Sequence, residues 1–337
     1  MAAKNSTGGS FLEWYSSTMP LRQAAAAEIG KWMKERVSDL GVAVDSISAR
    51  AKDLRSIRGK LREKRYKNPS VEMTDMIGVR TVLLFENEIE TVTTYLRDAL
   101  TISDRYSRKA GEELALAEFG YRSVHLIARF RGRTMPSYAR IGRPWVEVQV
   151  RSLLQHAWAA IGHDQLYKGA LVYPNMVKRR FFAVAGSLEL FDREFDLIRA
   201  YRLQSHKEWY SAFQLGKRTA ERYDIAGVGA FFEHLFPGSV WSDLPRGRPL
   251  LPAIEIALMN CLRRAGITTA RDLRMIVQKS GYRRRLQTYA SSIGTSPNAV
   301  ANFAKSVLAI GEKRSTLLLR DYEELIEDPL LRAAVSL

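Results

Sequence analysis

Hydrophobic and polar positions change their period along the chain, and this change predicts where helices give way to strands. Apolar side chains recur three or four positions apart in Phe11–Leu40, which predicts a helical N-terminal segment over residues 1–45. From Ser46 to Lys52 the period becomes two, because small or branched apolar residues alternate with polar ones. Such alternation is typical of a strand with one buried face.

Further strands and helices follow from the same two periods. Strands are predicted over Met76–Phe85, Tyr121–Phe130 and Trp145–Arg151. Helices are predicted over Arg58–Tyr66, Ile89–Leu100, Leu153–Leu166 and Asn175–Lys217. Strands mixed with helices predict an α+β domain, a mixed β-sheet flanked by helices, over residues 46–223.

The last third of the chain has a different composition. Glycine and proline cluster in residues 224–252, which predicts a linker. Residues 253–337 are predicted to form a smaller all-helical C-terminal domain, for which a regulatory role is open. Within it, Thr269 and Asp272 form a capping-box pattern at the start of a helix.

The charge balance bears on the partner. The chain has 52 Lys and Arg against 36 Asp and Glu, a net charge of +16. Such an excess attracts polyanions, but the basic residues are spread through the chain. Composition alone therefore leaves open both a nucleotide or nucleic-acid partner and a protein that is merely basic.

Two absences narrow the class of protein. No apolar run approaches the roughly 20 residues of a membrane span, so we expect no membrane partner. The single cysteine, Cys261, excludes an internal disulfide framework and a multi-cysteine zinc site. We therefore expect a cytoplasmic protein.

The polar faces of the predicted strands carry the candidate chemistry. They hold Arg50 and Lys52, then Tyr121, Ser123 and His125, then Glu147, Gln149 and Arg151. An ordinary half-solvated sheet also alternates, but its polar face is usually Lys, Glu and Thr. If the strands belong to one sheet, this mixture of Arg, Tyr, His, Glu and Gln favours a functional site.

Phosphate chemistry requires cations for the substrate and carboxylates for a metal. Ser56 and Lys60 are four residues apart, so they share a helix face, and they extend the cationic set that Arg50 and Lys52 begin. No G-x-x-x-x-G-K-[ST] segment occurs, which excludes a Walker-type phosphate loop.

Two carboxylates are the best candidate Mg²⁺ ligands. Asp75 precedes a buried strand, where an aspartate is often only a turn residue. Glu147 lies inside a valine-rich strand, where glutamate is disfavoured. Its presence there therefore indicates a functional role more strongly than the position of Asp75 does. His125, His156 and His163 lack zinc spacing, and both a place near the phosphate site and a structural role stay open for each.

Four blocks, in this order, resemble the synthetase domain of the RelA/SpoT family, whose members make the alarmones of the stringent response. They are Ser48–Lys52 with Ser56–Lys60, Thr74–Arg80, Gly120–His125, and Val146–Arg151 continuing through Gln155–Trp158 to His163 and Tyr167-Lys168. The resemblance covers residues 46–168 and implies a nucleotidyltransferase-like fold.

The resemblance also implies a reaction, in which the β,γ-pyrophosphoryl group of ATP moves to a ribose 3′-hydroxyl and AMP leaves. It implies that ATP and its phosphates bind to Arg50, Lys52, Ser56, Lys60 and Arg80. It implies that Asp75 and Glu147 hold Mg²⁺ and that Glu147 helps to deprotonate the hydroxyl. It implies that the acceptor binds to Tyr121, which stacks on its base, and to Ser123, His125, Gln149, Arg151 and His156.

The acceptor stays open at this point. Many alarmone synthetases have a basic or Asn-bearing approach to the Gly-Tyr pair, whereas this chain has the segment Gly111–Phe119. The first hypothesis is an alarmone synthetase that uses GDP or GTP. The second is a toxin, of the toxin–antitoxin or phage-defence kind, that modifies the 3′-terminal adenosine of tRNA or makes adenosine alarmones under restraint by its C-terminal domain. The third is an inert binding module, and a protein regulator and oligomers also remain open.

Overall fold

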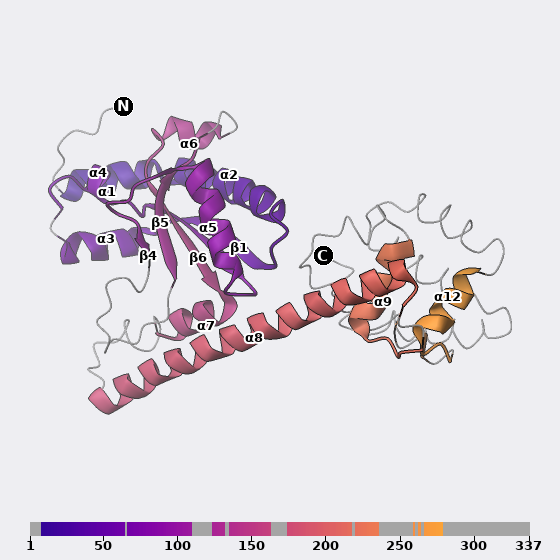
Figure 1. The fold of residues 1–337 in the computed structure, drawn as a ribbon. Coiled ribbons are helices and arrows are strands. Elements are labelled where there is room, and N and C mark those ends of the chain that lie inside the picture. Colours follow the sequence, from indigo (N-terminus) through magenta and orange to yellow (C-terminus); the bar gives the residue numbers. More distant parts are fainter. Residues whose placement is uncertain are drawn as a thin grey trace, which may run out of the picture. The chain divides into compact units, whose positions relative to one another are not determined.

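Figure 1 shows the chain as a computed structural model, which describes residues 8–64, 66–109, 123–131, 135–162, 174–217, 220–235, 259, 262–263 and 266–278. The chain divides into two compact units, Met1–Asp196 and Leu197–Leu337. The first unit contains a β-sheet with helices, and the described part of the second unit is helical apart from one isolated bridge between Arg222 and Thr269.

The elements of the first unit follow the predicted order. Its helices are α1 (Gly8–Ser17), α2 (Met19–Ser38), α3 (Leu54–Glu63), α4 (Pro69–Glu72), α5 (Glu88–Ala99), α6 (Pro136–Arg140) and α7 (Leu153–Gly162), and α8 (Asn175–Leu215) begins in it. Its strands are β1 (Val44–Ala51), β2 (Ile77–Leu83), β3 (Thr101–Ile102), β4 (Arg108–Lys109), β5 (Val124–Arg129) and β6 (Val146–Ser152). The short elements β3, β4, α4 and α6 were not predicted.

The sheet has the order β1-β2-β6-β5-β3, and β4 also pairs with β5. Strands β2 and β6 are parallel, while the other pairs are antiparallel. The sheet is therefore mixed and flanked by helices, which confirms the predicted fold class.

One face of this sheet is apolar and covered. Val79 of β2 and Val148 of β6 belong to the same buried cluster as Ile29 of α2 and Val92 of α5. Gly30 lets α2 come close to β1, because a Cβ at this position would lie only 3.1 Å from the Cβ of Ala49. Burial of this face leaves the alternate positions of the same strands for the site.

The N-terminal helical segment differs from the prediction in one respect. The predicted helix Phe11–Leu40 is two helices, and the hydroxyl of Thr18 between them donates to the carbonyl of Trp14 at 2.8 Å. Pro20 lies in the first turn of α2. Proline has no N–H to donate backwards, so it starts a helix more readily than it continues one.

The predicted linker at residues 224–252 is corrected in its first part, because helix α9 spans Ile225–Leu235. A Cβ on Gly227 would lie 3.0 Å from Tyr223 and 3.1 Å from the Trp209 ring. This glycine therefore serves close packing, which glycine content alone does not distinguish from a linker. The rest of the predicted linker lies outside the described residues.

Within the second unit, helix α12 (Ala270–Gln278) begins with the predicted capping pair. The carboxylate of Asp272 accepts from the backbone N–H of Thr269 at 2.8 Å, and the N–H of Asp272 donates to the Thr269 hydroxyl at 3.2 Å. This reciprocal arrangement satisfies two N–H groups at the helix start. Among the helices that the structure describes, none has the length and apolar character to cross a membrane.

Candidate functional site

Two rows of side chains cross the polar face of the sheet. The first row consists of Ser48 on β1, Arg80 on β2, Gln149 on β6 and His125 on β5. The second consists of Arg50, Gly78, Glu147 and Ile127 on the same four strands. Partners in register project to the same side of a sheet, so four strands build one surface.

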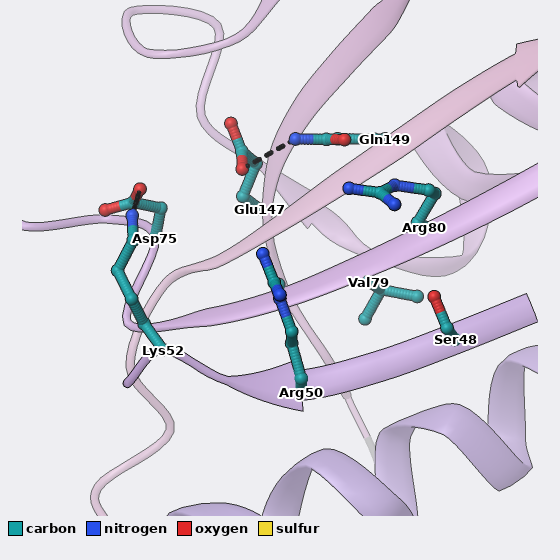
Figure 2. Close-up of a pocket in the computed structure, with 9 residues that line it drawn as sticks. Ser48, Arg50, Lys52, Asp75, Val79, Arg80, Glu147 and Gln149 are labelled. Carbon is teal, nitrogen blue, oxygen red and sulfur yellow. Dashed lines mark hydrogen bonds and ion pairs between the residues drawn. The ribbon is translucent and has the colours of Figure 1, made fainter. Parts of the chain in front are cut away.

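A pocket of about 150 Å³ lies on this surface (Figure 2). Its lining includes Arg50, Lys52, Asp75, Arg80, Glu147 and Gln149. Gly78 lies in register between Arg50 and Glu147, and a Cβ built on it would meet no atom within 4 Å. The missing side chain therefore keeps open the space between an arginine and a carboxylate.

One corner of the pocket is a carboxylate that two lysines share. Lys52 follows β1 and Lys60 lies in α3, and both ammonium groups donate to Oδ2 of Asp75 in the turn before β2. Burial raises the pKa of Asp75, but the two lysines outweigh it and hold that pKa below its ordinary value of 3.8. Two cations against one anion leave this corner, the Asp75 corner, with a positive charge suited to phosphate.

The second carboxylate, Glu147, is held by an imidazole and an amide, and Figure 2 shows the hydrogen bond from the amide of Gln149. Oε1 of Glu147 lies 3.2 Å from Nδ1 of His125, and Oε2 accepts from Nε2 of Gln149 at 3.0 Å. Ser123 Oγ lies 2.9 Å from Nε2 of the same histidine, and Arg151 donates to Oε1 of Gln149. These five side chains form a continuous hydrogen-bonded chain, the Glu147 row, across β5 and β6.

The hydrogen bonds fix the state of this row. The carboxylate can only accept, so Nδ1 of His125 carries a hydrogen, and Nε2 can accept from the Ser123 hydroxyl. Burial raises the pKa of Glu147, but the hydrogen bonds from His125 and Gln149 help to keep that pKa below the ordinary 4.5. Glu147 is therefore ionised at neutral pH and can receive a proton.

Two arginines, Arg151 at the end of this row and Arg80 on the neighbouring strand, have their positive charges poorly compensated. Burial and the neighbouring Arg80 lower the pKa of Arg151 to about 10, and burial and Arg50 lower that of Arg80. Within the described residues, the buried Nε atoms of both arginines have no hydrogen-bond partner. An anionic ligand would supply what these groups lack, because unpaired buried donors are costly.

His156 reaches the same neighbourhood from helix α7. Burial lowers its pKa, and the charges of Arg80 and Arg151 lower it further. In the part of the chain that the structure describes, its buried Nδ1 has no hydrogen-bond partner. His156 is therefore neutral near pH 7 and could bind a ligand only as a hydrogen-bond donor or acceptor.

The donor set fits Mg²⁺ that arrives with a nucleotide. Asp75 and Glu147 line the same pocket, and the charge of Asp75 raises the pKa of Glu147. The described residues contain no cluster of three or more His, Cys, Asp and Glu side chains suited to a metal. Mg²⁺ commonly takes one or two carboxylates and completes its shell with substrate phosphates and water, so two carboxylates suffice.

The structure brings most of the predicted site residues together, while their roles stay predictions. Ser56 is an exception, because its hydroxyl donates to Asp53 at 2.7 Å at the exposed start of α3. Tyr121, His163 and the segment Gly111–Phe119 lie outside the described residues. The placement of the acceptor base is therefore still a prediction from the resemblance.

Three pocket residues were missed as site residues. Ser48 shares the phase of Arg50, so the period of two already contained its signal. Gly78 contributes by lacking a side chain, and Val79 lines the pocket from a strand whose apolar face it shares. No pattern in a single sequence distinguishes these two from ordinary strand residues.

The family comparison agrees with this geometry. The family described as "Region found in RelA / SpoT proteins" matches residues 49–171. The GTP pyrophosphokinase YjbM of Bacillus subtilis (strain 168) is 28% identical over 217 residues, which are 62% of this chain and 98% of that protein.

Solved structures are similar over the same part of the chain. The crystal structure of small alarmone synthetase 1 from Bacillus subtilis has 28% identity and a TM-score of 0.47, over 57% of this chain and 98% of that one. The same synthetase bound to its product pppGpp has 25% identity and a TM-score of 0.46, over 56% and 98%. The family match over residues 49–171 confirms the predicted resemblance: this chain carries a RelA/SpoT-family synthetase domain.

Proposed function

We propose that this pyrophosphokinase domain transfers the β,γ-pyrophosphoryl group of ATP to the ribose 3′-hydroxyl of GDP or GTP and releases AMP. The family and the name of the relative, a GTP pyrophosphokinase, support the reaction class and a guanosine nucleotide as acceptor. The observation that carries the proposal is the pairing of the Asp75 corner with the Glu147 row in one pocket.

The two parts suit the two halves of the reaction. Lys52, Lys60 and Arg50 offer cations to the phosphate oxygens of ATP. Glu147, ionised and oriented by His125 and Gln149, is placed to take a proton from an attacking hydroxyl. Mg²⁺ would be held by Asp75 and Glu147 and would neutralise phosphate charge.

The transfer balances in atoms and electrons. The 3′-oxygen forms a bond to the β-phosphorus of ATP, and the bond from that phosphorus to the bridging α,β-oxygen breaks. AMP leaves with the electron pair of the broken bond, and the hydroxyl proton moves to Glu147. Preorganised cations lower the barrier most where charge builds up on the phosphoryl oxygens and the leaving oxygen.

A second acceptor, the 3′-terminal adenosine of tRNA, is favoured by the surface of α3. Exposed basic side chains follow this helix and the turn after it, namely Arg55, Arg58, Arg62, Lys64 and Lys67. Lys60 of the same helix belongs to the Asp75 corner. A phosphate backbone on this surface would place a nucleic-acid end near the pocket. Adenosine nucleotides, a restraining C-terminal domain, a protein regulator and an oligomer remain predictions.

Incubation with γ-labelled ATP and one acceptor at a time distinguishes the acceptors. With GDP or GTP we expect a labelled nucleotide and equimolar AMP, whereas with deacylated tRNA the label would enter RNA. Label in tRNA alone would replace the guanosine proposal with the second candidate. AMP that never exceeds the acceptor-free background would overturn both and favour an inert binding module.

A further inference from the structure

Helix α1 contacts the elements that carry the Asp75 corner. Its buried residues Phe11 and Tyr15 form a small apolar cluster with Ile57 of α3 and with Met73 and Met76, which flank Asp75 in sequence. This cluster is separate from the main core under the sheet. Helix α1 is therefore packed against the backbone that presents Lys60 and Asp75 to the pocket.

The hydroxyl of Tyr15 reaches the point where β1 ends and β2 begins. It donates to the carbonyl of Lys52 at 2.6 Å and lies 3.3 Å from the carbonyl of Met76. The N–H of Lys52 donates to the same Met76 carbonyl at 2.9 Å. The side chain of Tyr15 thus joins the backbone of Lys52 to the backbone of Met76, the residue after Asp75.

The ring of Tyr15 is itself fixed. The guanidinium of Arg22 lies 4.5 Å from the centroid of the Trp14 ring and 4.9 Å from that of Tyr15. Arg22 and Tyr15 are 1% and 0% exposed, and Nε of Arg22 donates to the Thr18 hydroxyl at 3.2 Å. A desolvated cation over an aromatic face is a strong contact, so the hydroxyl has little freedom to leave the two carbonyls.

Burial raises the pKa of Tyr15 to about 12, against a lowering effect of the nearby Arg22. The hydroxyl therefore keeps its hydrogen and acts as a donor across the pH range in which nucleotides are transferred. This contact does not depend on any ligand, since it joins side chain to backbone within the protein.

We propose that Tyr15 is a positioning residue, which sets the spacing between Lys52 and Asp75 so that the Asp75 corner accepts the phosphates of ATP. The inference rests on the proposed function for the identity of that ligand. Tyr15 is not among the residues that line the pocket, and it acts through the carbonyl of Lys52, which does line it. Without its hydroxyl this carbonyl would lose its donor, and the end of β1 would shift to regain one.

The variant Tyr15→Phe removes one oxygen and keeps the ring. We expect the KM for ATP and the dissociation constant of a non-hydrolysable ATP analogue to rise about threefold to tenfold, the size of one lost hydrogen bond. The kcat at saturating ATP and the KM for the acceptor should stay near the wild-type values. Initial rates and isothermal titration calorimetry measure these quantities.

Tyr138→Phe is the matched control. Tyr138 is also 0% exposed, and its hydroxyl donates to the carbonyl of Pro144 at 2.7 Å within the main core. Both variants should lower the melting temperature to a similar extent, but only Tyr15→Phe should change ATP binding. Equal ATP affinity in wild type and Tyr15→Phe, or the same loss in both variants, would overturn the proposal.

A readout without nucleotide separates this inference from the proposed function. Lysines carrying ¹³C-methyl groups report their surroundings by NMR, and the signals of Lys52 and Lys60 are assigned by replacing each with arginine. Tyr15→Phe should shift both signals, whereas Tyr138→Phe should leave them in place. Unchanged signals would overturn the inference even in an active enzyme. A wild type without acceptor-dependent AMP formation would overturn the proposed function and leave the NMR result to decide the inference.

Discussion

The Asp75 corner and the Glu147 row contain the same functional group in two electrostatic settings. In the corner, two ammonium groups share one carboxylate oxygen. In the row, a histidine and an amide each hold one carboxylate oxygen. Ion pairing with two lysines keeps a carboxylate charged at neutral pH, whereas hydrogen bonds from an imidazole and an amide orient a carboxylate without adding a full charge at each oxygen. If Glu147 takes the proton as proposed, this difference separates charge compensation from proton transfer within one pocket.

The largest expected effect comes from Glu147→Gln. The amide keeps the shape but cannot take the proton, so we expect kcat to fall by about a hundredfold to ten-thousandfold. The fold should survive, because Gln can still form hydrogen bonds with its neighbours. Initial rates measure kcat, and circular dichroism measures whether the fold is kept. The control is Glu90→Gln, at an exposed position on α5. Activity within a few-fold of wild type would remove Glu147 from its proposed role.

The second largest effect is expected from Lys52→Met in the Asp75 corner. Loss of one preorganised cation should lower kcat/KM for ATP by about a hundredfold to a thousandfold. Lys60 still compensates Asp75, so the protein should remain folded. The control is Lys31→Met on α2, an exposed lysine away from the pocket. A change in the acceptor KM alone would show that the corner does not serve ATP.

A third prediction concerns stability against pH. The pKa of Asp75 is lowered in the folded protein, so its contribution is complete above the unfolded pKa of about 3.9 and is lost as pH falls through the folded value. Asp75→Asn should cost about 2 kcal/mol of unfolding free energy at neutral pH, because two lysines lose their partner.

Urea unfolding of the wild type and of Asp75→Asn, at a series of pH values from neutral to acidic, measures the free energy of unfolding of each protein. The gap between the two stability curves should narrow as the wild-type carboxyl takes up its proton. A gap independent of pH would mean that the ion pairs contribute nothing, as is common for exposed pairs. The side chain of Asp75 is only 11% exposed, which favours the first outcome.

The smallest effect is expected from Gly78→Ala, at the glycine that lies in register between Arg50 and Glu147. The new methyl would project into open pocket space, so ATP affinity should fall about tenfold, equivalent to roughly 1.4 kcal/mol. Thermal stability should not fall, because alanine suits a strand better than glycine does. Gly9→Ala, where a Cβ also meets nothing, is the control. Unchanged ATP affinity in Gly78→Ala would place the nucleotide elsewhere.

Much of the site could be predicted because strand periodicity is local. The alternation in Ser46–Lys52 and Trp145–Arg151 placed Arg50, Glu147 and Gln149 on polar faces before any partner strand was known. Side-chain direction along a strand follows from backbone geometry alone. The long helix α8 was also predicted within two residues at each end, since its 41 residues contain no proline and a single glycine, Gly186.

Local patterns failed where packing decided. The glycine-containing segment Ile225–Leu235 is a helix, since its buried face packs on Trp209 and Tyr223. Likewise, nothing local indicates that Tyr15 lies at the carbonyl of a residue 37 positions away.

The sequence by itself determined the family, the strands, and which residues lie on the polar face of each strand. The tertiary structure decided the strand order β1-β2-β6-β5, the register that aligns Arg50 with Gly78 and Glu147, and the sharing of Asp75 by two lysines. The physical reason is range. Periodicity depends on residues that are neighbours in the sequence. Register and the sharing of a charge instead join distant segments, which approach each other only when the whole apolar face is buried.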